Sequence, residues 1–125
     1  MFGAIMAYYE HLPIYKKAME IAIYLEKIVR NFSRYNKYTL GSEMRKTSRE
    51  VVMLVVKANS QQDKLPILYQ LRERTEELKI LMRIAKEVQA FKNFKSFQTA
   101  IEGVISVSKQ NEGWIKSISG KTGRA

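Results

Sequence analysis

Side chains that carry out acid–base, nucleophilic or metal chemistry are scarce in this sequence of 125 residues. It contains one histidine, His11, one aspartate, Asp63, and no cysteine. His11 has only Glu10 as an acidic neighbour, so it lacks the convergent ligands that a metal site requires. The adjacent pair Glu76 and Glu77 would point in different directions on a helix and would not meet as an acid–base pair. There is also no Gly-rich phosphate loop. We therefore expect no enzyme, no catalytic residue, no metal site and no cofactor.

Basic side chains, in contrast, are abundant. The 22 Lys and Arg residues outnumber the 12 Asp and Glu residues and give a net charge of +10. Such an excess favours a nucleic acid, an anionic membrane or an acidic protein as partner; the alternative is an ordinary basic surface covered by solvent. The apolar run near the N-terminus is too short to cross a bilayer and has no basic segment before it. We expect neither a signal peptide nor a membrane span, and the absence of cysteine fits a cytoplasmic location.

The clearest basic pattern lies in the segment that follows Pro66. At about 100° per residue, four basic residues of this segment fall within roughly 60° of one another on a helix: Arg72, Lys79, Arg83 and Lys86. We call them the α-helical basic stripe, and such a stripe can bind phosphates or an acidic protein surface. The alternative is a solvated face in which Glu76 pairs with Lys79 and Arg83 with Glu87.

A second candidate lies near the C-terminal end. Trp114, the only tryptophan, and Lys116 are close together in the sequence, and an indole ring can stack on a base or anchor a partner. The alternative is that Trp114 covers one edge of the core.

Helices must position these candidates, because apolar residues recur at helical spacing in four segments. The first segment begins at Leu12–Pro13, and the second follows Thr39 as an N-cap. Both have apolar residues at steps of 4, 3, 4, 3 and 4: Ile14, Ala18, Ile21, Leu25, Ile28 and Phe32, then Leu40, Met44, Thr47, Val51, Leu54 and Ala58. The third segment follows the turn at 59–64, and the fourth begins near Asn93 or Ser96 as a cap. We expect a loop at 31–41.

Four helices with short connections predict an all-α fold, an antiparallel up-down-up-down four-helix bundle. We assign residues 1–11 to an N-terminal segment, 12–118 to the bundle and 119–125 to a disordered basic tail. The run at 51–56 is apolar throughout and could by propensity form a strand, but the periodicity on both sides favours a helix. Val52 and Val56 then point away from the apolar stripe and form a second apolar face, which we interpret as an oligomer interface.

The order and spacing of several segments resemble a known family. These segments are LPIYKKAMEIAIYLEKIV, KYTLG, VKANSQQDKLPILYQL, LRERTEELKILMRIAKEVQAF and EGWIKS. With them the chain resembles the four-helix-bundle family that includes ribosomal intervening-sequence proteins and the accessory variability determinant (Avd) of diversity-generating retroelements. The second helix ends in VVKANSQQ, in place of the proline- and glycine-containing end that is usual in the intervening-sequence branch. This difference favours the Avd branch.

The resemblance to Avd implies a five-fold barrel of four-helix bundles, and hence a homopentamer. It also implies binding to the reverse transcriptase of the retroelement and to nucleic acid, both template RNA and cDNA, in support of mutagenic cDNA synthesis. By position in the matching segments it points to Arg72, Arg83 and Lys86, and to Arg45 and Arg49 after YTLG, as contacts. The alternatives are a free-standing RNA- or DNA-binding bundle and a protein-only adaptor that docks on an acidic partner.

Overall fold

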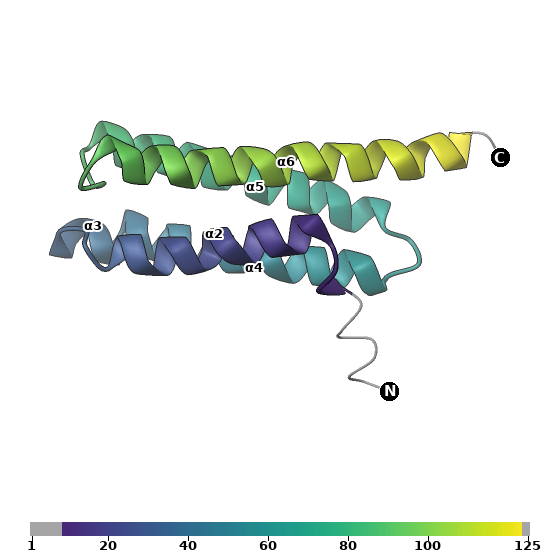
Figure 1. Ribbon diagram of the computed structural model, residues 1–125, viewed down its shortest axis with the longest axis horizontal. Helices are drawn as coiled ribbons and strands as arrows, with labels where there is room; N and C mark the ends of the chain where they lie inside the picture. Colours follow the sequence, from purple (N-terminus) through teal and green to yellow (C-terminus); the bar gives the residue numbers. More distant parts are fainter. Residues whose placement is uncertain (1–8, 124–125) are drawn as a thin grey trace.

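Four long helices form the body of the molecule. The computed structural model describes the backbone of residues 9–123 and the side chains of residues 9–120. The helices are α2 (Pro13–Val29), α3 (Arg34–Tyr38), α4 (Leu40–Ser60), α5 (Leu65–Glu87) and α6 (Phe94–Gly123). In Figure 1 the long helices lie lengthwise with alternating chain direction, and α2 and α5 each pack against both α4 and α6. The prediction of an all-α four-helix bundle is confirmed: residues 9–123 include no strand, and the run at 51–56 is helical.

Three helices begin with the proline or the capping side chain that the sequence predicts. Pro13 is at the first position of α2, and Pro66 lies in the first turn of α5, where the missing N–H of proline is not needed. Asn93 precedes α6, and its Oδ1 accepts a hydrogen bond from the backbone N–H of Ser96 at 2.8 Å. This bond satisfies one of the free N–H groups at the helix start.

The segment 31–41 is not the loop that we expected, because it contains the short helix α3. Ser33 Oγ accepts the backbone N–H of Asn36 at 3.3 Å, and Thr39 Oγ1 donates to the carbonyl of Tyr35 at 2.8 Å. Local bonds of this kind stabilise a single helical turn in a composition that is typical of loops. Thr39 is at the N-cap position of α4, as predicted, but its side chain bonds to α3 and not to α4.

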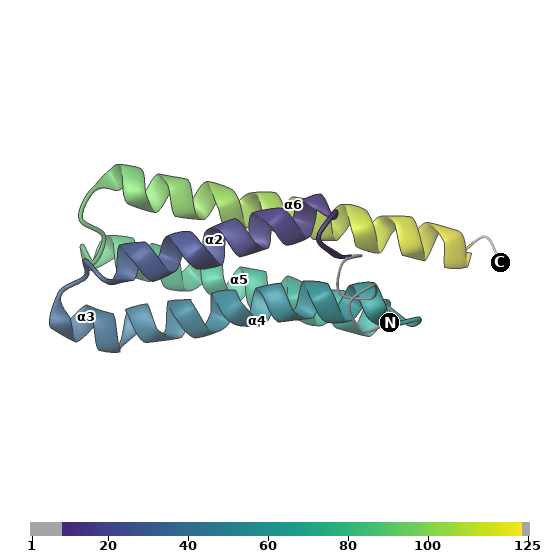
Figure 2. The ribbon, with the colours of Figure 1, turned by 60° about the horizontal axis from the view of Figure 1, so that its bottom comes forward.

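The prediction of a disordered tail is wrong for residues 119–123, because α6 continues through them. Once a helix exists, each added residue gains a backbone hydrogen bond without a new nucleation step, and this segment contains no proline. Figure 1 and Figure 2 both show this end of α6 projecting beyond the other helices. Residues 1–8 and 124–125 lie outside the described residues.

The core face of α4 also differs from the predicted one. Ser48, Val52 and Val55 are buried, whereas Leu54 is only partly buried. Val52 is 9 % exposed within the bundle itself, and Val56 is partly buried, so these two valines do not form an open second face. The reason is that α4 packs against both α2 and α5 and buries a wide face between them. An oligomer contact at these residues stays a prediction.

The connection between α5 and α6 begins with a strained residue. Gln89 has a φ of 61°, in the left-handed region that favours glycine. The N–H of Ala90 donates to the carbonyl of Ala85 at 2.8 Å, and the N–H of Gln89 donates to that of Lys86 at 3.0 Å. This pair of bonds is a Schellman motif, which satisfies carbonyls at the end of α5 and turns the chain toward α6.

A glycine lets α6 approach α2 closely. A Cβ atom at Gly103 would lie 2.7 Å from Cγ1 of the buried Ile21, whereas a Cβ atom at Gly113 of the same helix would meet nothing within 4 Å. An alanine side chain would therefore be crowded at position 103 and unobstructed at position 113 of the same helix.

We predict that Gly103→Ala and Gly113→Ala change stability in opposite directions. Gly103→Ala should lower the free energy of unfolding by about 1–2 kcal/mol, because overpacking displaces Ile21. Gly113→Ala should raise it by about 0.5–1 kcal/mol, because alanine loses less entropy in a helix. Urea unfolding followed by circular dichroism, at one protein concentration, measures both changes. Stabilisation by Gly103→Ala would contradict the close approach.

Candidate nucleic-acid and partner interface

Three of the four residues of the α-helical basic stripe on α5 form ion pairs, and the pairs of Arg72 and Lys79 are the shortest. Arg72 Nε and Nη2 each donate to the carboxylate of Glu112 on α6 at 2.8 Å. Lys79 Nζ lies 2.9 Å from Glu76, and its side chain is only 16 % exposed. Arg83 is exposed and forms no ion pair with any residue in the range 9–120. The sequence therefore predicts the shared side of the helix, but of the four residues only Arg83 has no ion-pair partner within residues 9–120.

Lys86 lies at the C-terminal end of the stripe and contacts two aromatic rings. Its Nζ is 5.8 Å from the ring centroid of Phe94 and 5.4 Å from that of Phe97, and 3.8 Å from Glu87. The pairing of Glu76 with Lys79 that a solvated face requires is present, but the second pair, Arg83 with Glu87, does not form among the described residues. Arg83 and Lys86 are therefore the stripe residues most available to a partner.

Arg45 and Arg49 connect two helices. Arg49 Nη2 lies 2.8 Å from Glu26 Oε2 on α2, and Arg45 Nε lies 3.4 Å from Oε1 of the same carboxylate. Arg45 Nη2 also donates to the backbone carbonyl of Glu26 at 3.3 Å. One carboxylate thus holds both guanidinium groups against α2, and Arg49, with 65 % of its side chain exposed, is the more accessible of the two.

The candidates on α6 lie apart from this pair. Trp114 is partly buried and packs against the core, while Lys116 is exposed. The packing of Trp114 agrees with the alternative interpretation, in which the indole covers an edge of the core.

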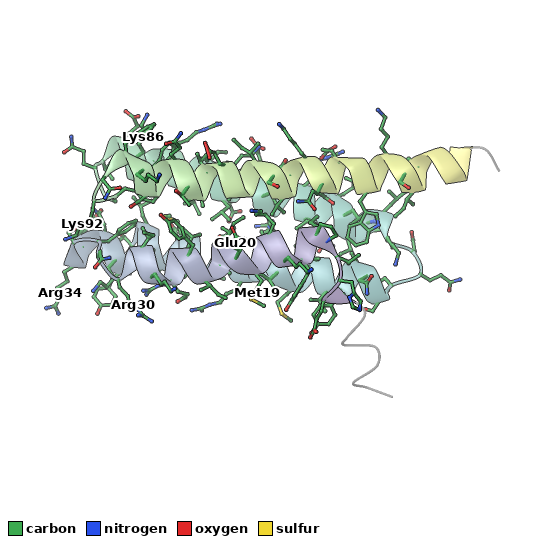
Figure 3. The ribbon with its side chains drawn as sticks, in the orientation of Figure 1. Met19, Glu20, Arg30, Arg34, Lys86 and Lys92 are labelled. Atoms are coloured by element: carbon green, nitrogen blue, oxygen red, sulfur yellow. The ribbon has the colours of Figure 1, made fainter. Side chains whose placement is uncertain are left out.

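The structure gathers a cluster of cations of which the sequence pattern had indicated only Lys86. They lie at one end of the bundle, around the connections from α2 to α3 and from α5 to α6; Figure 3 shows four of them there. We call this cluster the basic end: Lys27, Arg30, Arg34, Lys37, Lys86, Lys92 and Lys95. Among the described residues, Lys86 alone of the seven has an ion-pair partner, Glu87. The signal in the sequence is the scarcity of acidic residues, since 27–37 contains none and 86–95 contains one.

An apolar stripe lies on the outer face of α5, opposite the core. Ile80, Ile84 and Val88 follow one another at steps of four residues and are 49 %, 44 % and 52 % exposed. The spacing of these residues was visible in the sequence, but only the packing shows that they face away from the bundle. An aligned row of half-exposed aliphatic side chains is a feature of protein–protein contacts.

Within residues 9–123 no three His, Asp or Glu side chains come together as possible metal ligands. No helix in this range is long and apolar enough to cross a membrane.

The ion pair between Arg72 and Glu112 joins α5 to α6 and perturbs both groups. The hydrogen bonds from Arg72 hold the pKa of Glu112 below its ordinary value of 4.5, and the same bonds raise the pKa of Arg72. A carboxyl whose pKa is lower in the folded state stabilises the fold above its unfolded pKa, and this contribution disappears as the pH falls through the folded pKa.

We predict that Glu112→Gln destabilises the protein slightly near neutral pH and that the difference from wild type shrinks below about pH 4.5. Urea unfolding at a series of pH values from about 6 to about 3 measures this. The control is the same substitution in an Arg72→Gln background, where the pH dependence of the difference should be lost because the partner is absent. A constant difference over the whole range would show that the pair does not contribute.

The comparisons with known proteins agree with this architecture. A family model described as bAvd-like matches residues 12–118, from the N-cap of α2 to near the end of α6. A comparison with curated proteins finds no match. Because the matched segment covers most of the chain and all four long helices, the chain belongs to the bAvd-like family and is an Avd-type four-helix bundle.

Proposed function

We propose that this protein is a non-catalytic accessory factor of a diversity-generating retroelement, which binds the element's reverse transcriptase and nucleic acid during mutagenic cDNA synthesis. The match to the bAvd-like family over residues 12–118 carries this proposal. The net charge of +10 supports it, because a basic surface attracts the phosphates of template RNA and cDNA. The unpaired cations of the basic end and the exposed Arg83 provide the charge that such contacts use.

The proposal includes assembly into a homo-oligomer, a pentamer by the family resemblance. The support in the structure is the outer apolar stripe of α5, which a monomer leaves in contact with water. A five-fold ring needs a head-to-tail interface, in which this stripe meets a different surface of the next subunit. The stripe therefore contributes one half of each contact.

We predict that Ile84→Glu dissociates the oligomer, because a charge at the centre of the stripe would be buried without a partner. Light scattering should give about the monomer mass of 14.6 kDa for this variant and about five times that mass for wild type. Ile84→Leu, which keeps the side chain apolar, is the matched control and should assemble normally. Circular dichroism checks that helix content is unchanged. A wild-type monomer at micromolar concentration would overturn the assembly proposal.

We predict that Arg83→Glu combined with Lys86→Glu weakens binding to the reverse transcriptase, to RNA, or to both, because four units of charge change in each subunit. Like charges placed against each other at an interface can cost several kcal/mol, whereas exposed charge reversals hardly affect folding. Capture of the reverse transcriptase and retention of RNA are measured separately on the same variant. Lys16→Glu with Lys109→Glu, two exposed positions elsewhere, gives a control with the same change in net charge.

The outcomes separate the proposed function from its alternatives. For wild type, affinity for a duplex should fall with salt at a log–log slope of roughly −4 to −5, if about four to six phosphates are neutralised. RNA binding without capture of the reverse transcriptase would indicate a free-standing nucleic-acid-binding bundle. Capture of the polymerase without RNA binding at low salt would indicate a protein-only adaptor.

A further inference from the structure

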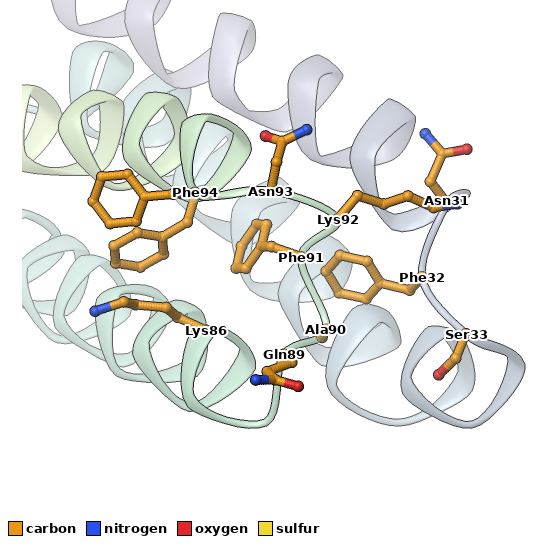
Figure 4. Close-up of a pocket in the computed structure, with 11 residues that line it drawn as sticks. Asn31, Phe32, Ser33, Lys86, Gln89, Ala90, Phe91, Lys92, Asn93 and Phe94 are labelled. Atoms are coloured by element: carbon orange, nitrogen blue, oxygen red, sulfur yellow. The ribbon is translucent and has the colours of Figure 1, made fainter.

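A pocket opens at the basic end, between the connections from α2 to α3 and from α5 to α6 (Figure 4). Its volume is about 810 Å³, within the range of about 300–1,000 Å³ that is typical of small-molecule sites. Phe32, Phe91 and Phe97 line it and contact one another edge to face, with ring centroids 5.4 and 5.6 Å apart. All three rings are buried and fixed by the core, so the apolar wall of the pocket is formed before any ligand binds.

The rim of the pocket combines an exposed ring with positive charge. Phe94 is 63 % exposed, although its ring contacts Phe97 at a centroid distance of 5.9 Å. Lys86 Nζ lies over both rings, and Lys92 and the amide of Gln89 line the same pocket (Figure 4). The exposed area of Phe94 is thus available for stacking, with the ammonium group of Lys86 nearby.

The rim also carries the polar side chain of Gln89, at a backbone position that favours glycine. Gln89 has its φ of 61° where glycine would relieve the strain, and glycine would also remove the amide from the pocket. The Schellman motif accounts for the backbone conformation of Gln89, and its side chain lines the pocket.

The surface around the pocket carries further rings and unpaired cations. Tyr35 and Tyr38 on α3 are 76 % and 71 % exposed, more than any other large apolar or aromatic side chain within residues 9–120. Six of the seven cations of the basic end have no ion-pair partner among the described residues. Exposed aromatic rings interspersed with free cations are the combination that binds unpaired nucleic acid, because bases stack on the rings while phosphates meet the cations.

We propose that the basic end binds single-stranded nucleic acid, and that the pocket takes one unpaired nucleotide, whose base stacks on Phe94 and whose phosphates contact Lys86 and Lys92. This inference rests on the proposed nucleic-acid binding and locates it. In a duplex the bases are already stacked on one another, so they cannot stack on the exposed aromatic rings. An acidic protein would satisfy the cations but would leave unexplained why three aromatic rings stay exposed beside them.

The test is binding of fluorescent probes by the full chain, followed by fluorescence anisotropy. The probes are an oligo(A) RNA and an oligo(dA) DNA of about 12 nucleotides, within the site sizes of single-strand binders, and a duplex of the same length. Phe94→Leu should weaken binding of both single strands by about fivefold or more, the loss expected for one stacked base. Duplex binding should change by less than about twofold, because phosphate contacts remain.

Two further variants distinguish stacking from charge and from damage to the fold. Phe94→Trp restores a ring and should restore single-strand affinity, whereas Lys92→Glu should weaken all three probes more than Lys109→Glu, its charge-matched control in the middle of α6. Helix content and oligomer mass are checked for each variant. A preference of the wild type for RNA or for DNA leaves the inference standing provided that Phe94→Leu weakens the preferred strand.

Three results would overturn the inference. The first is unchanged single-strand affinity in Phe94→Leu while wild type binds the probes; the proposed function would then stand and only the pocket would be excluded. The second is an effect of Phe94→Leu on capture of the reverse transcriptase but not on RNA, which would make the basic end a protein-docking surface. The third is a wild type that binds none of the probes at low salt. This result would contradict both this inference and the nucleic-acid part of the proposed function.

Discussion

Burial of one wide apolar face on each long helix is the constraint on which the other features depend. Leu25 of α2, Met44 of α4, Leu71 of α5 and Val104 of α6 are at most 1 % exposed. Once these faces are turned inward, charged side chains can lie only on the outer faces, at the seams between helices and at the two ends. The alternating chain direction then brings the α2–α3 and α5–α6 connections to the same end, which concentrates their cations.

The cations along the sides of the bundle and those at the basic end differ in how many of them are free to contact a partner. At the seams, cations from one helix meet carboxylates of the next, as Arg72 does with Glu112 and Arg49 with Glu26. Such exposed pairs add little to stability, but they lower the charge that the sides present to a partner. At the basic end the cations outnumber the acidic groups, so most of them stay free to meet phosphates. The basic end therefore offers a group of free cations to the phosphates of a nucleic acid.

Local sequence signals predicted the elements where the deciding interaction is itself local. The proline at position 13 and the cap at Asn93 start their helices where the pattern indicates, because each acts within one helical turn. Composition was a weaker guide at 31–41, where hydrogen bonds from Ser33 and Thr39 form a short helix. It also failed at 119–123, where an existing helix simply continues. In both places helical hydrogen bonding outweighed the composition, which is typical of a loop at 31–41 and of a disordered tail at 119–123.

The sequence by itself determined the all-α class, the helix starts and the shared side of Arg72, Lys79, Arg83 and Lys86, because these follow from residue types and helical spacing. Only the tertiary structure decided which of those charges are free, since Glu112 comes from a helix 40 residues away. It also decided that Val52 is buried within the bundle, because two neighbouring helices cover α4. The pocket beside Phe94 was also decided by the tertiary structure. Its walls come from two connections that are far apart in the chain, and helix packing brings them together.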